Sequence, residues 1–500
     1  MLRSLAENAP VPAAATWPRL AAGLARRFAL DVRSLAAFRI ALGLLLVADA
    51  GLRSRDFHLR FAADGMFPPQ LIRNYFDDDP TQWSLALVHD DIRWAAAVLT
   101  AQALAGICLA CGWRTTAATM VAWVAQTSVF RRTIPAANAG DLWLCCMLFW
   151  SCFLPLGTAW SLDARRRPPG PGRVCGPATA ALVLQVMAVY VGAGLSKLNG
   201  SWLNGEAVRY ALSVHDHGTP LGSWLTGADG FVHLLSWSVV AFEIVAPLVF
   251  VAWPAARLAI AAAFILFHVT IWLTMSVGLF APIGIVAWLP LLPGTVWGRR
   301  EPRGETVGID CASTPARWLC GAAGLLAAVS FIHDRSALNR LPLPVPARGA
   351  INLLSLTQEW GMFGTVPPLE QWAYGRAVLA DGRVVDLLRS GRPVEVERPT
   401  GGFTSLPHHR WHKLMWILPR PKVRPFAPSV AAALAADWNS RHAAADRAVA
   451  VEIRFAQRNL ADPDAPLQEM LVGAWPDRDT AGTGGLERFL EAAAATAPRD

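Results

Sequence analysis

Long apolar runs separated by polar loops occupy the first two thirds of the chain. About 20 apolar residues cross the hydrocarbon core of a bilayer, so we expect membrane-spanning helices at these runs. Nine are predicted, over residues 34–52, 93–111, 115–130, 142–156, 177–195, 231–253, 256–275, 279–297 and 318–332. The fold class is therefore mainly α, a polytopic helical membrane bundle.

The pattern changes after residue 333 to an ordinary mixture of polar and apolar positions. The stretch Tyr374–Arg389 alternates around Asp381-Gly382, which is a turn dipeptide, and this predicts a β-hairpin. Residues 448–460 alternate as another strand, and the alanine-rich stretch Ser429–His442 predicts a helix. We therefore expect a basic tail (1–33), a helical bundle (34–333) and a small C-terminal α+β domain (334–500).

Arginines in short loops indicate the orientation, because cytoplasmic loops carry an excess of Lys and Arg. Placing the N-terminus in the cytoplasm puts Arg114, Arg257 and the pair at 299–300 on that side, while Arg131 and Arg132 count against it. The basic stretch 19–33 is expected to lie along the cytoplasmic interface. Nine spans then make the C-terminal domain extracytoplasmic, and we predict a multi-pass protein of the cell inner membrane.

Composition supports a membrane protein and excludes other classes. Of the 500 residues, 54% are hydrophobic and only 16% are charged, fewer than in ordinary soluble domains. The net charge is +8, but the arginines lie in loops between apolar runs and form no continuous basic face, so no nucleic-acid partner is expected. The eight cysteines lie mostly in or beside apolar runs and lack the spacing of a zinc site, so no metal is expected.

The fifth apolar run ends in a lysine. Met187, Tyr190, Gly194 and Lys197 are three or four residues apart, so they share one face of the helix. Gly192 and Gly194 would allow another helix or a ligand to approach closely. Two interpretations of Lys197 stay open: a desolvated amine that acts as a base, or an ammonium that snorkels to the headgroups.

Three other polar residues lie inside apolar runs, where an unpaired charge is costly. Glu243 is expected to be protonated, to pair with a residue such as Arg39, or to be functional. His268 is expected either to form a hydrogen bond between helices or to take part in catalysis. Asp141 precedes the fourth run and is expected to cap that helix, with electrostatic help to Lys197 as the alternative.

Three histidines lie in the loop before the sixth run and at the start of that run. His215, His217 and His233 could be imagined as metal ligands, although loop histidines of this density are usually solvated. We therefore predict no metal site there.

Several segments resemble the vitamin K-dependent gamma-carboxylases and their bacterial relatives, the horizontally transferred transmembrane (HTTM) domain family. The stretch VYVGAGLSKLNGSWLNGEAVRY is similar to the family's apolar helix that closes with a glycine, a lysine pair, a Trp and another glycine. Ser196 stands at the first lysine of that pair, Lys197 matches the second, and the Trp is Trp202. The segment FHVTIWLTMSVGLF matches at His268, Gly278 and Phe280, with Ile271 where the family has an asparagine.

Weaker similarities occur at Phe242–Leu248, at Gln358–Phe363 and in the hairpin. The polar bend Asn138–Asp141 lacks the histidine that vertebrate carboxylases carry there. The resemblance spans roughly residues 34–415, and its two specific motifs are those of Lys197 and His268.

The resemblance implies a function and its cofactors. The amine of Lys197 would take a proton from a reduced quinone similar to vitamin K hydroquinone, and O2 and CO2 would be the other reactants. The substrate would be a peptide glutamate, for carboxylation or oxidation, with the membrane lipid supplying the quinone. Tyr190, Trp202, Arg39, Glu243, His268 and Asp141 are the candidate supporting residues.

Two alternatives stay open beside this enzyme. One is a non-enzymatic membrane module that binds or matures a secreted partner. The other is a transporter that uses Arg39, Glu243 and His268, although no inverted repeat is visible in the sequence.

Overall fold

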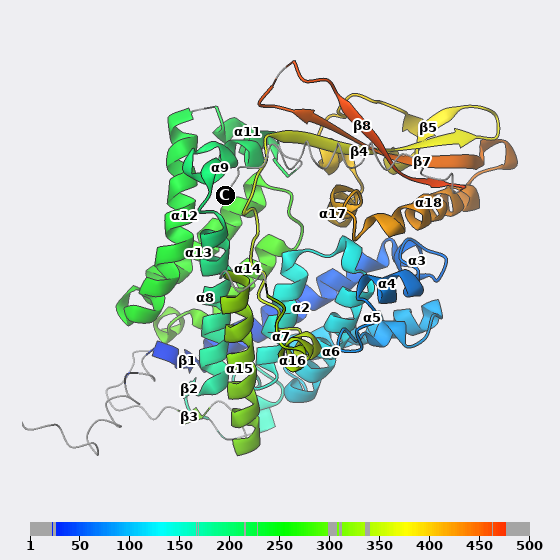
Figure 1. Ribbon diagram of the computed structural model, residues 1–500. Helices are drawn as coiled ribbons and strands as arrows, with labels where there is room; N and C mark the ends of the chain where they lie inside the picture. Colours follow the sequence, from blue (N-terminus) through cyan, green and yellow to red (C-terminus); the bar gives the residue numbers. More distant parts are fainter. Residues whose placement is uncertain are drawn as a thin grey trace, which may run out of the picture.

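Each predicted apolar run forms a helix in the computed structural model (Figure 1). The structure describes residues 23, 27–166, 168, 170–214, 217–227, 229–298, 308–309, 313–335, 341–462 and 464–476. The helices that correspond to the nine runs are α2 (Val32–Ser54), α5 (Ile92–Cys111), α6 (Thr115–Arg132), α7 (Ala139–Ser151), α8 (Pro177–Ser196), α12 (Asp229–Ala252), α13 (Arg257–Thr274), α14 (Phe280–Trp288) and α15 (Thr314–Arg335).

Six helices in the described part of the chain are long and apolar enough to cross a membrane. Their spans are Val32–Ser54, Ile92–Cys111, Pro177–Ser196, Gly230–Ala252, Pro254–Thr274 and Thr314–Arg335. The predicted helix 279–297 was too long, since α14 ends at Trp288 and two short 3-10 helices follow (Leu289–Leu291 and Gly294–Trp297). Pro290 and Pro293 explain this, because proline lacks the backbone N–H that continues a helix. Similarly, α7 ends at Ser151, short of the predicted residue 156.

Glycines set the closest contacts between helices. A Cβ atom on Gly43 of α2 would lie 2.4 Å from the carbonyl oxygen of Gly106 on α5. The glycines of α8 behave as predicted: a Cβ atom on Gly192 would meet Trp360, and one on Gly194 would meet Ile244 of α12 at 2.6 Å. Helices α2 and α5 therefore pack backbone to backbone, whereas α8 packs closely against the side chains of Ile244 and Trp360, as small residues allow in membranes.

The C-terminal part forms an antiparallel five-stranded sheet in the order β6-β5-β4-β7-β8. The predicted hairpin is confirmed as β4 (Leu369–Leu379) and β5 (Val384–Asp386), and the predicted strand as β7 (Ala448–Asn459). The predicted helix corresponds to α18 (Ala427–Arg441), which packs on β7 and β8. Two strands were not predicted, β6 (Arg392–Pro393) and β8 (Gln468–Trp475).

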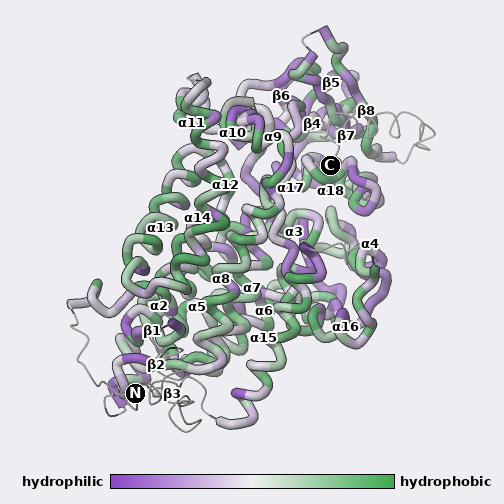
Figure 2. Tube along the Cα trace, turned by 60° about the vertical axis from the view of Figure 1, so that its left-hand side comes forward, coloured by the Kyte–Doolittle hydropathy of each residue, from purple (hydrophilic) through white to green (hydrophobic). Residues whose placement is uncertain are grey.

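This sheet, α18 and the short helix α17 (His409–Ile417) form a cap over one end of the bundle, with both helices between sheet and bundle (Figure 1). The long loop after α2 belongs to the same core, because Met66, Phe67 and Ile72 pack with the apolar side chains of the cap. This loop contains α3 (Phe57–Phe61) and α4 (Pro69–Tyr75). The hydrophobic positions concentrate in the bundle, whereas the cap is mixed (Figure 2).

The remaining elements are short. At the opposite end of the bundle, β1 (Leu30–Asp31), β2 (Arg173–Cys175) and β3 (Gly308–Ile309) form a small unpredicted sheet (Figure 1). Residues 19–22 and 24–26 of the predicted interfacial stretch 19–33 lie outside the described residues, and Leu30–Asp31 near its end is a strand. The loop between α8 and α12 contains α9 (Gly200–Leu203), α10 (Glu206–Arg209) and α11 (Pro220–Leu225), and α16 (Val345–Leu354) follows α15.

We predict that Gly43→Val destabilises the bundle, because the added side chain collides with the backbone of α5. Overpacking of this kind costs about 1–3 kcal/mol, which should lower the thermal unfolding midpoint of the detergent-solubilised protein by several degrees. Gly51→Val on the same helix is the control, since nothing lies within 4 Å of its Cβ position. Equal midpoints for the two variants would contradict the proposed backbone contact.

Candidate functional site

The side chain of Lys197 is buried at the C-terminal end of α8 and is 3% exposed. Its Nζ atom donates hydrogen bonds to the carboxylate of Glu243 at 2.8 Å, the carbonyl of Met362 at 3.0 Å and the carbonyl of Ala193 at 3.3 Å. Three acceptors match the three N–H donors of an ammonium. The amine therefore does not snorkel to solvent but is enclosed within the protein.

Glu243 of α12 forms an ion pair with this lysine and is itself buried, with 5% of its surface exposed. An ion pair was one of the expectations for Glu243 and it is present, but the partner is Lys197 and not Arg39. Arg39 instead donates to the carbonyls of Leu109, Ala110 and Trp160, so it satisfies the last carbonyls of α5. A cation at a helix C-terminus is favoured by the helix dipole, and this explains a lone arginine in an apolar run.

The third partner of Lys197 comes from a distant segment, Gln358–Gly364, which we name the strap. The strap lies along α8: Gln358 pairs with Gln185 through both amide groups, and Trp360 packs over Gly192. Beyond Met362, the carbonyl of Gly364 accepts a hydrogen bond from the Asn199 side chain at 2.7 Å. The strap therefore covers the end of α8 with backbone carbonyls.

Trp202 also contributes to this pocket. Its ring centroid lies 5.2 Å from the Lys197 Nζ atom, within the range of a cation–π contact. Its indole N–H donates to the carbonyl of Phe363 at 2.8 Å. Trp202 therefore contacts the lysine and holds the strap at the same time.

Tyr190 and His268 form a separate polar cluster deeper in the bundle. The Tyr190 hydroxyl lies 2.7 Å from the Nε2 atom of His268 on α13, and it accepts a hydrogen bond from the indole of Trp288. The expected hydrogen bond of His268 between helices is thus confirmed. Tyr190 precedes Lys197 by seven residues, about 10 Å along a helix, so this cluster does not contact the amine.

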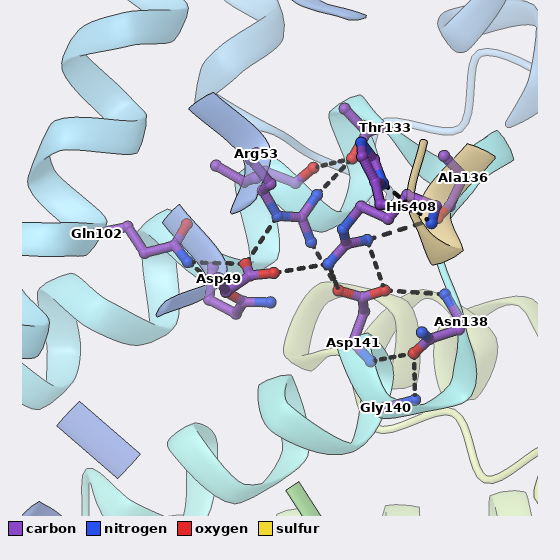
Figure 3. Close-up of polar contacts among 12 residues, drawn as sticks. Asp49, Arg53, Gln102, Thr133, Ala136, Asn138, Gly140, Asp141 and His408 are labelled. Atoms are coloured by element: carbon purple, nitrogen blue, oxygen red, sulfur yellow. Dashed lines mark hydrogen bonds and ion pairs between the residues drawn. The ribbon is translucent and has the colours of Figure 1, made fainter. Parts of the chain in front are cut away.

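Asp141 belongs to a buried network of ion pairs with Asp49, Arg53 and Arg410. Figure 3 shows Asp141, Asp49 and Arg53 with their polar contacts. Its carboxylate binds Arg53 of α2 at 2.6 Å and Arg410 of α17 at 2.8 Å, and both arginines also bind Asp49. The expected capping role needs correction, because Asn138 is the N-cap of α7. Asp141 is the third helical residue, and its side chain bonds back to the Asn138 N–H at 2.9 Å in a capping box.

This charge network attaches the cap to the bundle. Burial opposes the charged form of Arg410, but Asp141 and Asp49 raise its pKa above the usual value. The neighbouring residues of α17 also bind the N-cap residue of α3, which follows α2: His408 and Trp411 both contact Asp56, at 2.5 Å and 2.7 Å. Burial alone would raise the pKa of Asp56, but the hydrogen bond from His408 and the charge of Arg60 lower it to about 2. The position of α17 is therefore fixed by ion pairs.

A cavity of about 890 Å³ lies between the bundle and the cap. Its lining includes Phe280 of α14, Met362 and Phe363 of the strap, and His409 and Lys413 of α17. Lys197 does not line the cavity, but Met362 contacts both the cavity and the lysine. The motif that contains His268 also contributes to this region, because its Gly278 has a φ angle of +59° and packs against the ring of His409.

His217 and His233, the two loop histidines that the structure describes, have different surroundings. His217 lines the cavity and its ring stacks near that of His412, with centroids 4.2 Å apart. His233 packs over Gly205, and His215 lies outside the described residues. Within the described ranges, no group of three or more His, Cys, Asp or Glu side chains is arranged to hold a metal ion.

A comparison with protein families matches residues 28–297 to the HTTM domain. The matched part covers more than half of the chain and contains α8 and the Lys197 motif. The chain belongs to the HTTM domain family. It is thus a member of a membrane protein family associated with vitamin K-dependent carboxylase-like proteins. Neither the comparison with curated proteins nor that with solved structures returned a match.

The strap and α17 lie outside the matched HTTM domain. Lys197, Glu243 and Trp202 are inside it, while the carbonyl of Met362 and the side chain of Arg410 come from the last third of the chain. Sequence reasoning missed Arg410, His409 and Lys413. One available signal was the basic run HHRWHK at 408–413, which stands out in an otherwise mixed region.

We predict that Arg410→Met strongly destabilises this HTTM protein, because Asp49 and Asp141 would then share a single arginine. Breaking a buried ion pair costs about 3–5 kcal/mol, measurable as an earlier unfolding midpoint in detergent. Arg376→Met, which removes a partly exposed pair with Glu452, is the control and should cost about 1 kcal/mol or less.

Adding Asp49→Asn to Arg410→Met should recover part of the loss, since it removes an unbalanced negative charge. A double variant as unstable as the sum of the two single variants would argue against a coupled network.

Proposed function

We propose that this HTTM protein is a membrane enzyme of the carboxylase-like type in which Lys197 acts as a base on a reduced quinone. The carrying observation is the enclosed amine: a lysine at the membrane end of α8, bonded to Glu243 and shielded from solvent by the strap. The strong base that such a reaction generates from the reduced quinone and O2 would be quenched by bulk water, so the chemistry needs a dry position.

The ion pair supports proton transfer by the chain's own atoms. A hydrogen bond of 2.8 Å joins Lys197 Nζ to Glu243 Oε2, so one proton can sit on either side of the pair. With the proton on the carboxyl group, the amine has a free lone pair and can accept a proton from a ligand. Glu243 is in this proposal the positioning partner that stores the proton, and Trp202 excludes water from one side.

The cavity fits the flat ring of a quinone. Phe280, Phe363 and Trp416 supply aromatic surface, and Ser276 and His217 supply polar groups that suit ring hydroxyls. A bound reduced quinone would supply an acidic hydroxyl and the electrons for reaction with O2. Contact with Lys197 requires the Met362 carbonyl to move, and the glycines at 361 and 364 on either side give the strap the freedom to do so. CO2 and a peptide glutamate remain proposed reactants.

We also propose that all nine helices cross the inner membrane, with the N-terminus in the cytoplasm and the cap outside. The arginine distribution in the loops supports this orientation. Lys197 and the cap lie at the same end of the bundle, so the cavity would face the outer leaflet, where a lipid-borne quinone and an exported peptide can meet. Helix α6 would span as an inner helix, whereas α7 (13 residues) and α14 (9 residues) are too short to cross by themselves and would cross only together with the segments that follow them.

The contacts of the three charged or polar residues inside the bundle do not support the transporter alternative. Arg39, Glu243 and His268 were its three candidate residues, and each contacts a different partner: backbone carbonyls, Lys197 and Tyr190 respectively. Such separate pairs do not form a shared ion pathway.

Lys197→Met should lower the rate at which added reduced quinone is turned over. The expected decrease is about 10²–10⁴-fold if the lysine acts as a general base. Glu243→Gln should reduce the rate while leaving an amine in place. The measurement is anaerobic loading of the purified protein with reduced quinone, followed by addition of O2 and quantification of oxidised product. Lys422→Met is the matched control, because Lys422 is exposed in the cap.

Retention of full activity in Lys197→Met would refute the proposed base. Absence of any quinone binding or turnover in the wild-type protein, together with capture of an exported partner, would instead favour the non-enzymatic module.

A further inference from the structure

The wall of the cavity formed by α17 presents a cation that has no counter-ion. Lys413 lines the cavity, and its Nζ atom lies 4.5 Å from the ring centroid of Trp416. Within the described residues, the neighbouring charge that acts on this amine is another cation, Arg420, and not a carboxylate. Arg420 approaches the same Trp416 ring at 4.4 Å, so two cations share one aromatic side chain.

The remaining polar groups of the cavity do not neutralise these cations. Asp334 pairs with the adjacent Arg335, and the positive charges that act on Glu359 are those of Arg335 and Lys422. Burial and the charge of Arg410 lower the pKa of His409 to about 3, so this imidazole is neutral and can only exchange hydrogen bonds. The titratable and charged groups that line the cavity are His217, Asp334, Arg335, Glu359, His409, His412, Lys413 and Arg420.

The other lining residues are largely apolar. Val277 and Phe280 come from the bundle, Phe363 from the strap, Val366 from the chain that follows it, and Phe455 from β7. A ligand that fills such a space needs an apolar body, and the unpaired ammonium needs an anionic group.

We propose that this cavity is a binding site for an amphipathic oxyanion, an apolar molecule bearing one carboxylate, sulfonate or phosphate group, held by Lys413 with Arg420 beside it. The site lies at the junction of bundle and cap, so the anion can come from solution or from the headgroup of an anionic lipid. The anion would occupy the same cavity as the proposed quinone but would be held by a different cation, so this inference does not depend on the role of Lys197.

The pH dependence follows from the lysine. Burial and the nearby Arg420 lower the pKa of Lys413 to about 8. The ammonium form binds the anion, so affinity is retained below pH 8 and decreases as the pH rises through 8. An ordinary exposed lysine would keep its charge until about pH 10.

The test uses the full chain in uncharged detergent and titration calorimetry with 1-naphthoate, corrected with protein-free micelles. We expect saturable binding at pH 7 that is weaker at pH 9.5, and weaker binding of the neutral 1-naphthalenemethanol. Lys413→Met should weaken naphthoate binding about tenfold or more, the usual effect of losing a charged hydrogen bond. Lys422→Met is the matched control, because Lys422 also lies over an aromatic ring, that of Tyr75, but does not line the cavity.

Repeating the titration in nanodiscs separates the two sources of the anion. The affinity for naphthoate is compared between nanodiscs of phosphatidylglycerol and nanodiscs of phosphatidylcholine. A lower affinity in phosphatidylglycerol indicates that an anionic lipid headgroup occupies the site. Equal affinities indicate that the natural ligand is a soluble anion. Lys197→Met should bind naphthoate normally, so loss of quinone turnover and loss of anion binding remain distinguishable. Equal binding by wild type and Lys413→Met, or no saturable binding by wild type, would overturn the proposal.

Discussion

Charges buried in an apolar bundle must find partners, and this requirement governs how the chain is arranged. Lys197 meets Glu243 and two carbonyls, Arg39 meets the carbonyls that end α5, and Arg53 and Arg410 meet two aspartates. Each partnership joins segments that are distant in the sequence. The ion pairs thus fix the relative positions of helices whose apolar faces alone would specify them poorly, because lipid tails solvate those faces equally well.

Small residues complement this constraint. Gly194 brings the backbone of α8 against Ile244 of α12, and this closeness places the neighbouring Glu243 within reach of Lys197. Gly192 does the same for Trp360 of the strap. The lysine pocket is therefore produced by two glycines one turn before it, together with a carboxylate on the facing helix. The family motif at this helix has a geometric reason beyond the lysine itself.

The sequence predicted the helices well, because apolar runs of membrane length leave few alternatives. The predicted end of the eighth helix was wrong because prolines at 290 and 293 interrupt an otherwise apolar run. The partner of Glu243 could not be predicted, since Glu243 lies near the middle of its run and Lys197 at the end of another, so Arg39 looked equally suitable. β8 was missed because the short apolar stretch LVGAW does not alternate clearly. The strap and α17 were missed as site elements because only tertiary packing brings residues 358–364 and 408–413 to the end of the bundle.

The hydrogen bond from Lys197 to Met362 joins residues 165 positions apart. A ribosome that has just released α8 into the bilayer has still to make α12, with Glu243, and then the strap. During most of membrane insertion the lysine therefore lacks its final partners, and its ammonium group lies at the headgroups or in water. Closure of its pocket is a late event of biogenesis, so a chain interrupted before residue 358 would be inserted but would leave its amine uncovered.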